Sequence, residues 1–376
     1  MSEYQFYEFK SIDKPLSKDD KEKIGTWSSR SNPSSTGAIF TYSYGNFPKS
    51  EIEVVEKYFD AMFYISNWGT TRLIFKFPKE LIPAGKIKPY CVEYGLALNL
   101  KSNFYLLDLI FEDEEGGGGR WIEGEGWLSS LVQLRDDILN GDYRTLYLIW
   151  LKNIMTPIDN EWDNMDPEIL EPDIPQNLKE LTGPLQDLIE IFDIDKDYVE
   201  AAAENCQTIH NEEIFDYEAN IKNLNDNEKH EFIVRLLNNE ALLSSKLKMR
   251  LKEFAGSNKG VNSDNKRRSA GEIAERVKEM RKARKEREAK ERQEKHLRKL
   301  KDLELNQTKL WIKVYQLISE KQSKAYDEAI KILKDLKELA VYKGSLDDYS
   351  NKVEEINKEY KRLSGLTGRI SDAKLI

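Results

Sequence analysis

The sequence has few cysteines, few histidines and no long apolar run. Two cysteines in 376 residues, Cys91 and Cys206, exclude a disulfide framework and are typical of a reducing compartment. The longest apolar clusters, Phe104–Phe111 and Leu146–Leu151, are too short to span a bilayer. The chain opens without a basic and apolar leader. The sequence therefore predicts a cytoplasmic protein with no membrane partner.

Large apolar side chains are also scarce, and the shortage is uneven. Apolar residues make up 39% of the chain and charged residues 33%. Most aromatic residues precede residue 156, whereas residues 266–301 have almost no large apolar side chain. The first part can bury a core, and residues 266–301 cannot.

The net charge of -9 hides two regions of opposite sign. Residues 266–301 contain 16 Lys and Arg against 7 Glu, a balance of +9, so the rest of the chain carries -18. Residues 151–230 contain 21 Asp and Glu against 5 Lys, a balance of -16. A basic segment attracts nucleic acid and acidic surfaces, whereas an acidic body repels nucleic acid.

These patterns divide the chain into parts of different composition. The fold class we expect is an α+β body with a small antiparallel sheet, followed by helical segments, because strand and helix patterns segregate along the chain. The Gly, Asn and Ser content of residues 256–264 marks the clearest boundary. The predicted parts are an α+β body (1–155), an acidic helical region (156–255), a linker (256–265), a basic charged helix (266–301), a helical hairpin or bundle (302–363) and a tail (364–376).

Within the body, alternating and aromatic segments predict strands at Tyr4–Lys10 and Arg72–Phe77. Two further strands, at 90–98 and 104–112, are joined by a short polar turn and predict a hairpin. The spacing of the apolar residues between Glu51 and Trp68 predicts one amphipathic helix.

The basic segment predicts a solvated single helix. An apolar stripe begins at Ile273 and Val277 but stops after Met280, which excludes a coiled coil. Opposite charges four residues apart, such as Glu288 and Arg292, support a helix over 272–301, with a length of about 45 Å at 1.5 Å per residue. The residues that we predict to bind phosphates or an acidic partner are Lys266, Arg267, Arg268, Arg281, Lys282, Arg284, Lys285, Arg287, Lys290 and Arg292. The alternative is a spacer helix that binds no partner. Stacking on the bases of single strands is not supported, because no aromatic residues are interleaved with the cations.

Two weaker patterns concern metal ions and catalysis. Asp108 and Glu112, with Glu8 and Lys10, have the residue types of a metal-dependent nuclease, but not its order along the chain. The segment Asp193–Glu204 has carboxylates at calcium-loop spacing, yet it lacks the required glycine. We therefore predict no catalytic residue, no metal ligand and no cofactor.

Two further patterns are equally incomplete. Cys206 and His210 lie four residues apart, but a metal site needs two more ligands. The glycines of Gly116–Gly119 follow four acidic residues and lack the Lys-Ser/Thr ending of a phosphate loop. Neither pattern adds a predicted site.

Several segments resemble a family of uncharacterised bacterial proteins. The resemblance rests on Tyr4–Leu16, Tyr58–Ala61, Asn67–Leu73, Gly141–Tyr147 and Tyr326–Ile330. It implies a bacterial, cytosolic protein of several parts and carries no catalytic residue.

Two functions remain open. The first is a non-catalytic scaffold or interaction subunit that binds protein partners, with a basic helix that contacts nucleic acid or an acidic partner. The alternative is a metal-dependent hydrolase or nuclease that acts through the N-terminal body. We favour the first, because an extended charged helix is present and no complete catalytic set is visible.

Overall fold

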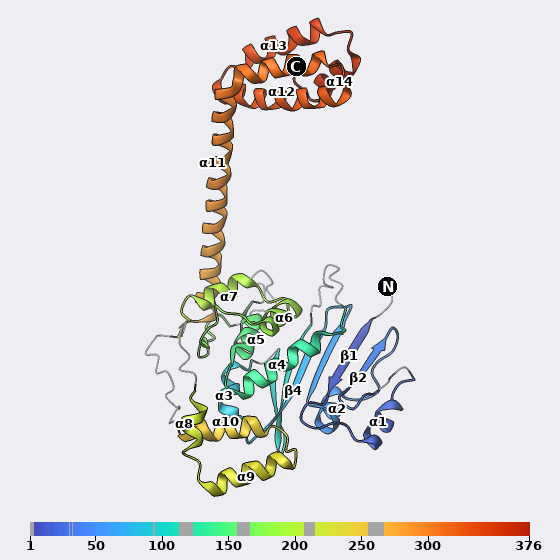
Figure 1. Ribbon diagram of the computed structural model, residues 1–376, viewed down its shortest axis with the longest axis vertical. Coiled ribbons are helices and arrows are strands. Elements are labelled where there is room, and N and C mark those ends of the chain that lie inside the picture. Colours follow the sequence, from blue (N-terminus) through green and yellow to red (C-terminus); the bar gives the residue numbers. More distant parts are fainter. Residues whose placement is uncertain are drawn as a thin grey trace. The chain divides into compact units, whose positions relative to one another are not determined.

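The chain forms two compact units, Met1–Met280 and Arg281–Ile376, in a computed structural model. The structure describes residues 4–29, 31, 33–92, 95–112, 123–155, 166–206, 215–254 and 267–376. The predicted linker, 256–265, lies outside these ranges. Figure 1 shows the elements of both units, and each unit is described here by itself.

The first unit contains a six-stranded antiparallel sheet with the strand order β2-β1-β3-β4-β6-β5. The predicted α+β class with an antiparallel sheet is confirmed, and so is the hairpin, which β5 and β6 form. The strands are β1 (Gln5–Lys10), β2 (Gly37–Tyr42), β3 (Ala61–Ser66), β4 (Thr71–Pro78), β5 (Leu96–Leu100) and β6 (Phe104–Phe111).

The predicted helix over Glu51–Trp68 is wrong in its second half. Helix α2 (Glu51–Tyr58) ends at Phe59, and the chain continues as strand β3. All six residues of β3 are buried, because β3 lies inside the sheet between β1 and β4 and both of its faces are covered. Such a strand shows no alternation of polar and apolar residues, and its sequence therefore looks like a buried helix.

Helices cover both faces of the sheet. On one face, α1 (Lys18–Gly25) and α2 place Ile24 and Val55 against an aromatic cluster that includes Phe9, Phe40 and Phe59. On the other face, α4 (Trp127–Leu139) and α5 (Arg144–Ile154) bury leucines and Trp150 against β3, β4 and β6 (Figure 1). Two short helices, α3 (Ala84–Ile87) and η1 (Lys88–Tyr90), lie before β5.

The acidic helical region adds five helices among the described residues, and two of them join the main core. Leu185 and Leu188 of α6 (Gly183–Ile191) and Ala201 and Ala202 of α7 (Lys196–Ala203) are buried in the same cluster as Trp150. The others are α8 (Tyr217–Ile221), α9 (Asp226–Leu237) and α10 (Leu243–Phe254).

The second unit is a helical bundle, as predicted. Helix α11 (Ala270–Ser319) begins in the first unit and continues without a break through the predicted basic helix into the bundle. Its partners are α12 (Ser323–Lys343), α13 (Leu346–Glu359) and α14 (Ser364–Asp372). The predicted tail is therefore largely a helix: Leu366 and Ile370 of α14 are buried in the bundle core, as is Leu375 after it.

Candidate functional site

The exposed part of α11 is the strongest candidate for a binding site. Between Arg281 and Lys299, every side chain is exposed except the half-buried Arg284. This stretch contains ten Lys or Arg against four Glu. Because no core packs on it, charge and helix propensity alone support its helical form, as the sequence predicts.

The cations of this stretch are concentrated on one face. Arg281, Lys285, Arg292, Lys295 and Lys299 follow one another at intervals of four, seven, three and four residues, which places them on one side of a helix. We call these five residues the cationic row. One acid falls within the row, Glu288, and it pairs with Arg292 at 3.5 Å.

The opposite face has no such excess. Lys290 and Lys301 lie there with Glu286 and Glu294, at positions that the helical period places about half a turn from the row, and Arg287 lies about a third of a turn from it. Charges of both signs therefore alternate on this face, and its net field is weak.

The cationic character continues toward the bundle. A groove along α11 from Lys295 to Lys313 is lined by nine residues, of which five are Lys or Arg, and it has a volume of about 620 Å³. Lys299 is held at its edge by Asp335 at 2.7 Å and Glu338 at 2.9 Å, both on α12. The binding residues predicted from the sequence end at Arg292 and therefore do not include the groove's cations Lys295, Arg298, Lys299, Lys309 and Lys313.

The predicted binding residues separate into two groups. Arg281, Lys282, Arg284, Lys285, Arg287, Lys290 and Arg292 lie together on α11. Arg267 and Arg268 precede it in the first unit, and Lys266 lies outside the described residues. Arg267 forms an exposed ion pair with Asp173 at 2.6 Å.

Arg268 has a structural environment that sequence analysis did not foresee. Its guanidinium binds both oxygens of Glu171, at 2.8 and 2.7 Å, and donates to the carbonyls of Ala201 and Ala202. Glu171 also accepts a hydrogen bond from the hydroxyl of Tyr147, a buried residue of α5. Burial and the neighbouring carboxylate raise the pKa of Tyr147.

We call Tyr147, Glu171 and Arg268 the clasp. It joins the start of α11 to α5 and α7, and backbone bonds reinforce it, since Ala270 donates to Ile169 at 2.8 Å. Because the donors of Arg268 serve the clasp, this residue contributes to the fold of the first unit.

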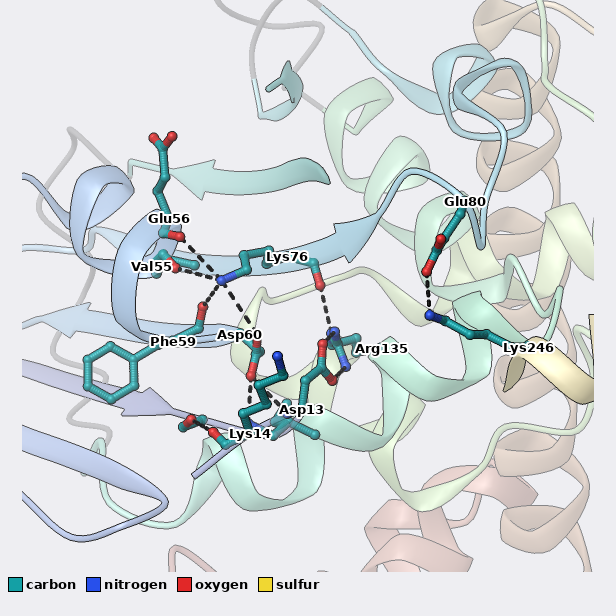
Figure 2. A network of polar contacts seen from close by, with 12 residues as sticks. Asp13, Lys14, Val55, Glu56, Phe59, Asp60, Lys76, Glu80, Arg135 and Lys246 are labelled. Carbon is teal, nitrogen blue, oxygen red and sulfur yellow. Dashed lines mark hydrogen bonds and ion pairs between the residues drawn. The ribbon is translucent and has the colours of Figure 1, made fainter. Parts of the chain in front are cut away.

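A second polar network lies beside the sheet, where Figure 2 shows it. Arg135 of α4 is fully buried, binds both oxygens of Asp13 at 2.9 and 2.7 Å, and donates to the carbonyl of Lys76 at 2.8 Å. The ammonium of Lys76 reaches the carbonyl of Phe59 at 3.0 Å and lies 3.6 Å from Asp60. These groups satisfy one another and tie α4 to the end of α2, so we interpret the network as structural.

Asp108 and Glu8, two carboxylates of the nuclease hypothesis, do not meet. Asp108 on β6 is held by Arg72 at 2.8 and 2.7 Å on the face covered by α2. Glu8 on β1 lies on the other face, and β3 and β4 separate the two strands. Lys10 donates to Ser129 at 2.7 Å, and Glu112 is exposed beyond β6.

The other acidic and thiol patterns also have local partners. In the calcium-like segment, Asp195 caps α7 by accepting from the N–H of Asp197 at 2.8 Å, and Glu204 binds Arg276 at 2.8 Å. Cys206 is buried and donates to the carbonyl of Pro175 at 3.2 Å, whereas His210 lies outside the described residues. Within the described ranges, no three His, Cys, Asp or Glu side chains converge as metal ligands.

Glu8 predicts a pH-dependent stability. Burial raises the pKa of this carboxyl, although Lys10 opposes the shift from 3.7 Å. A carboxyl with a raised pKa in the folded state favours folding when it is protonated, and this contribution is lost as the pH rises from about 4.5 through the folded pKa. The variant Glu8→Gln should not lose stability in this way as the pH rises. Its free energy of unfolding at pH 7 should therefore exceed that of the wild type by about 1 kcal/mol.

Urea unfolding between pH 4 and pH 8 measures this effect. The exposed Glu22→Gln in α1 is the matched control and should keep the wild-type profile. An unchanged profile for Glu8→Gln would contradict the prediction.

Comparison with known proteins adds no further residue role: no protein-family model, no curated protein and no solved structure matches the chain. Among the described residues, no helix combines the length and the apolar content that crossing a membrane requires. The evidence for function is therefore the geometry of the chain's own residues.

Proposed function

We propose that the protein is a non-catalytic scaffold or interaction subunit of a bacterial cytosolic complex, and that the cationic row of α11 binds its partner. The observation that carries this proposal is the exposed stretch Arg281–Lys299, where the cations exceed the acids and gather on one face. A helix that buries no side chains against a core is consistent with a role in binding a partner or in spacing two parts of the chain.

The partner that suits the row presents a series of negative charges. The phosphates of a nucleic acid provide such a series, and so do the carboxylates of an acidic protein. A phosphate partner would be bound without sequence preference, because Lys and Arg side chains on one helix face contact the backbone and no aromatic side chain is available for stacking.

A matched pair of variants tests this proposal in the full-length chain. The row variant Lys285→Gln, Arg292→Gln, Lys295→Gln should bind a 20-base-pair duplex about tenfold or more weakly than the wild type in 50 mM salt. The slope of log K against log salt should become less steep by about 3. Fluorescence anisotropy of a labelled duplex gives both quantities.

The control variant Arg287→Gln, Lys290→Gln, Lys301→Gln removes the same charge from positions outside the row. It should retain most of the affinity, since the row is intact. Equal losses in the two variants would contradict a face-specific site. Binding of poly-glutamate without binding of the duplex would assign the row to an acidic protein, and no binding of either probe in 50 mM salt would overturn the proposal.

A further inference from the structure

Strand β2 is an edge of the sheet, and the direction of its backbone groups follows from its neighbours. The carbonyls of Tyr4 and Lys10 accept from Asn67 and Asp60, so the even-numbered residues of β1 face β3 and the odd-numbered ones face β2. In an antiparallel ladder the N–H and C=O of one residue point the same way. By the observed register, β2 pairs with β1 through Ala38, Phe40 and Tyr42. Ile39 and Thr41 therefore direct their N–H and C=O groups away from the sheet.

This edge has none of the usual protection. Natural edge strands carry charges, prolines or bulges, or are covered, because their unpaired groups otherwise bind another strand. The six residues of β2, Gly-Ala-Ile-Phe-Thr-Tyr, include no charge and no proline. In the part of the chain that the structure describes, Ser34 bonds to the carbonyl of Gly37, and no hydrogen bond reaches the outward groups of Ile39 or Thr41.

The side chains on this edge are exposed as well. Ile39 is 42% exposed, and Thr41 on the same face is also exposed. The opposite edge differs, since a bridge between Val92 and Leu96 covers the start of β5. An apolar side chain beside unpaired backbone groups is the combination that a further strand would cover.

We propose that a second copy of this chain covers the edge, with β2 pairing antiparallel to β2 of the other copy about a two-fold axis at Phe40. In this register Ile39 of one protomer lies opposite Thr41 of its partner, and both residues direct their backbone groups toward each other. The pairing thus forms four backbone hydrogen bonds and joins the two sheets into one. It goes beyond the proposed role of the cationic row and does not depend on it.

Two properties of β2 favour a copy over an unrelated peptide. The outward groups are self-complementary about Phe40, as a two-fold interface requires. The strand is uncharged, so two copies meet without repulsion of like charges, and the Ile39 side chains of the two copies come within diagonal reach on one face. Because a single strand pair buries little surface, we expect a dimer that dissociates in the micromolar range.

Sedimentation velocity of the full-length chain over a concentration series tests this proposal. The wild type should pass from a monomer of 43.8 kDa to a dimer of twice that mass. Ile39→Lys should raise the dissociation constant at least about tenfold, since it places two lysines beside the two-fold axis. Leu100→Lys, at an exposed position of the other edge strand, is the matched control and should dimerise like the wild type.

Hydrogen exchange gives an independent readout without substitution. The amides of Ile39 and Thr41 should be protected at high concentration and exchange faster on dilution, while that of Phe40 stays protected in both states. A chain that remains monomeric up to about 100 µM, or a dimer that Ile39→Lys leaves unchanged, would overturn the assignment of a second copy and leave the edge to a segment of another protein.

Discussion

Replacing Arg135 by Ala should lower the free energy of unfolding of the first unit by about 3–5 kcal/mol. Arg135 is fully buried and is the bidentate partner of Asp13. Burial raises the pKa of Asp13 although Arg135 opposes the shift, which means that the charged carboxylate depends on its partner. Without the guanidinium, the carbonyl of Lys76 and the half-buried carboxylate of Asp13 lose their donors, and both losses destabilise the fold.

Urea unfolding followed by tryptophan fluorescence measures this loss, because six of the seven tryptophans precede residue 281. The double variant Asp13→Asn, Arg135→Met should cost less than Arg135→Ala, since it leaves no unpaired charge. The exposed Arg292→Ala is the control and should change stability by about 0.5 kcal/mol or less. A cost for Arg135→Ala no larger than that of the control would show that the network of Figure 2 does not support the fold.

The second large effect concerns the clasp. Arg268→Ala should destabilise the first unit by about 3 kcal/mol, because Glu171 is 3% exposed and would keep its charge without a cationic partner. The neighbouring Arg267→Ala is the natural control, since its pair with Asp173 is exposed and should contribute about 0–1 kcal/mol. The same unfolding experiment compares the two variants.

The clasp variant also separates a structural role from a binding role. At a temperature where it remains folded, Arg268→Ala should bind the duplex as tightly as the wild type, because its guanidinium faces Glu171 and the carbonyls of α7. A loss of duplex affinity without a loss of stability would return Arg268 to the predicted phosphate-binding set.

Local patterns in the sequence predicted the elements that are stabilised by residues close together in the chain. The hairpin of β5 and β6 follows from two apolar segments and a short polar turn, and the helix over 272–301 follows from charge pairs four residues apart. Neither conclusion needs a distant contact. The concentration of cations on this helix was visible from composition, and their arrangement on one face follows from the helical period.

Features that depend on distant contacts were not predictable. The sequence of strand β3 predicts part of a helix, because burial on both faces removes the alternation of polar and apolar residues. The bond of Arg268 to Glu171 could not be predicted, because the two residues lie 97 positions apart in the chain. Arg135 and Asp13 are separated by 122 positions, so nothing near Arg135 marks it as a core residue.

Helix α11 has neither glycine nor proline between Glu272 and Ser319. The cationic row and the buried Leu300 therefore lie on one uninterrupted helix, and their angular positions about its axis are fixed relative to each other. Segments of this kind tolerate changes of length only in certain steps, unlike surface loops, where insertions cost little. Adding seven or eleven residues within Arg281–Lys299 would turn the two halves of the row by only about 20° relative to each other. Adding two would turn them by about 200° and divide the row between opposite sides of the helix. Natural variants of the protein should therefore preserve the angle between the two halves of the row about the helix axis more strictly than the length of the helix.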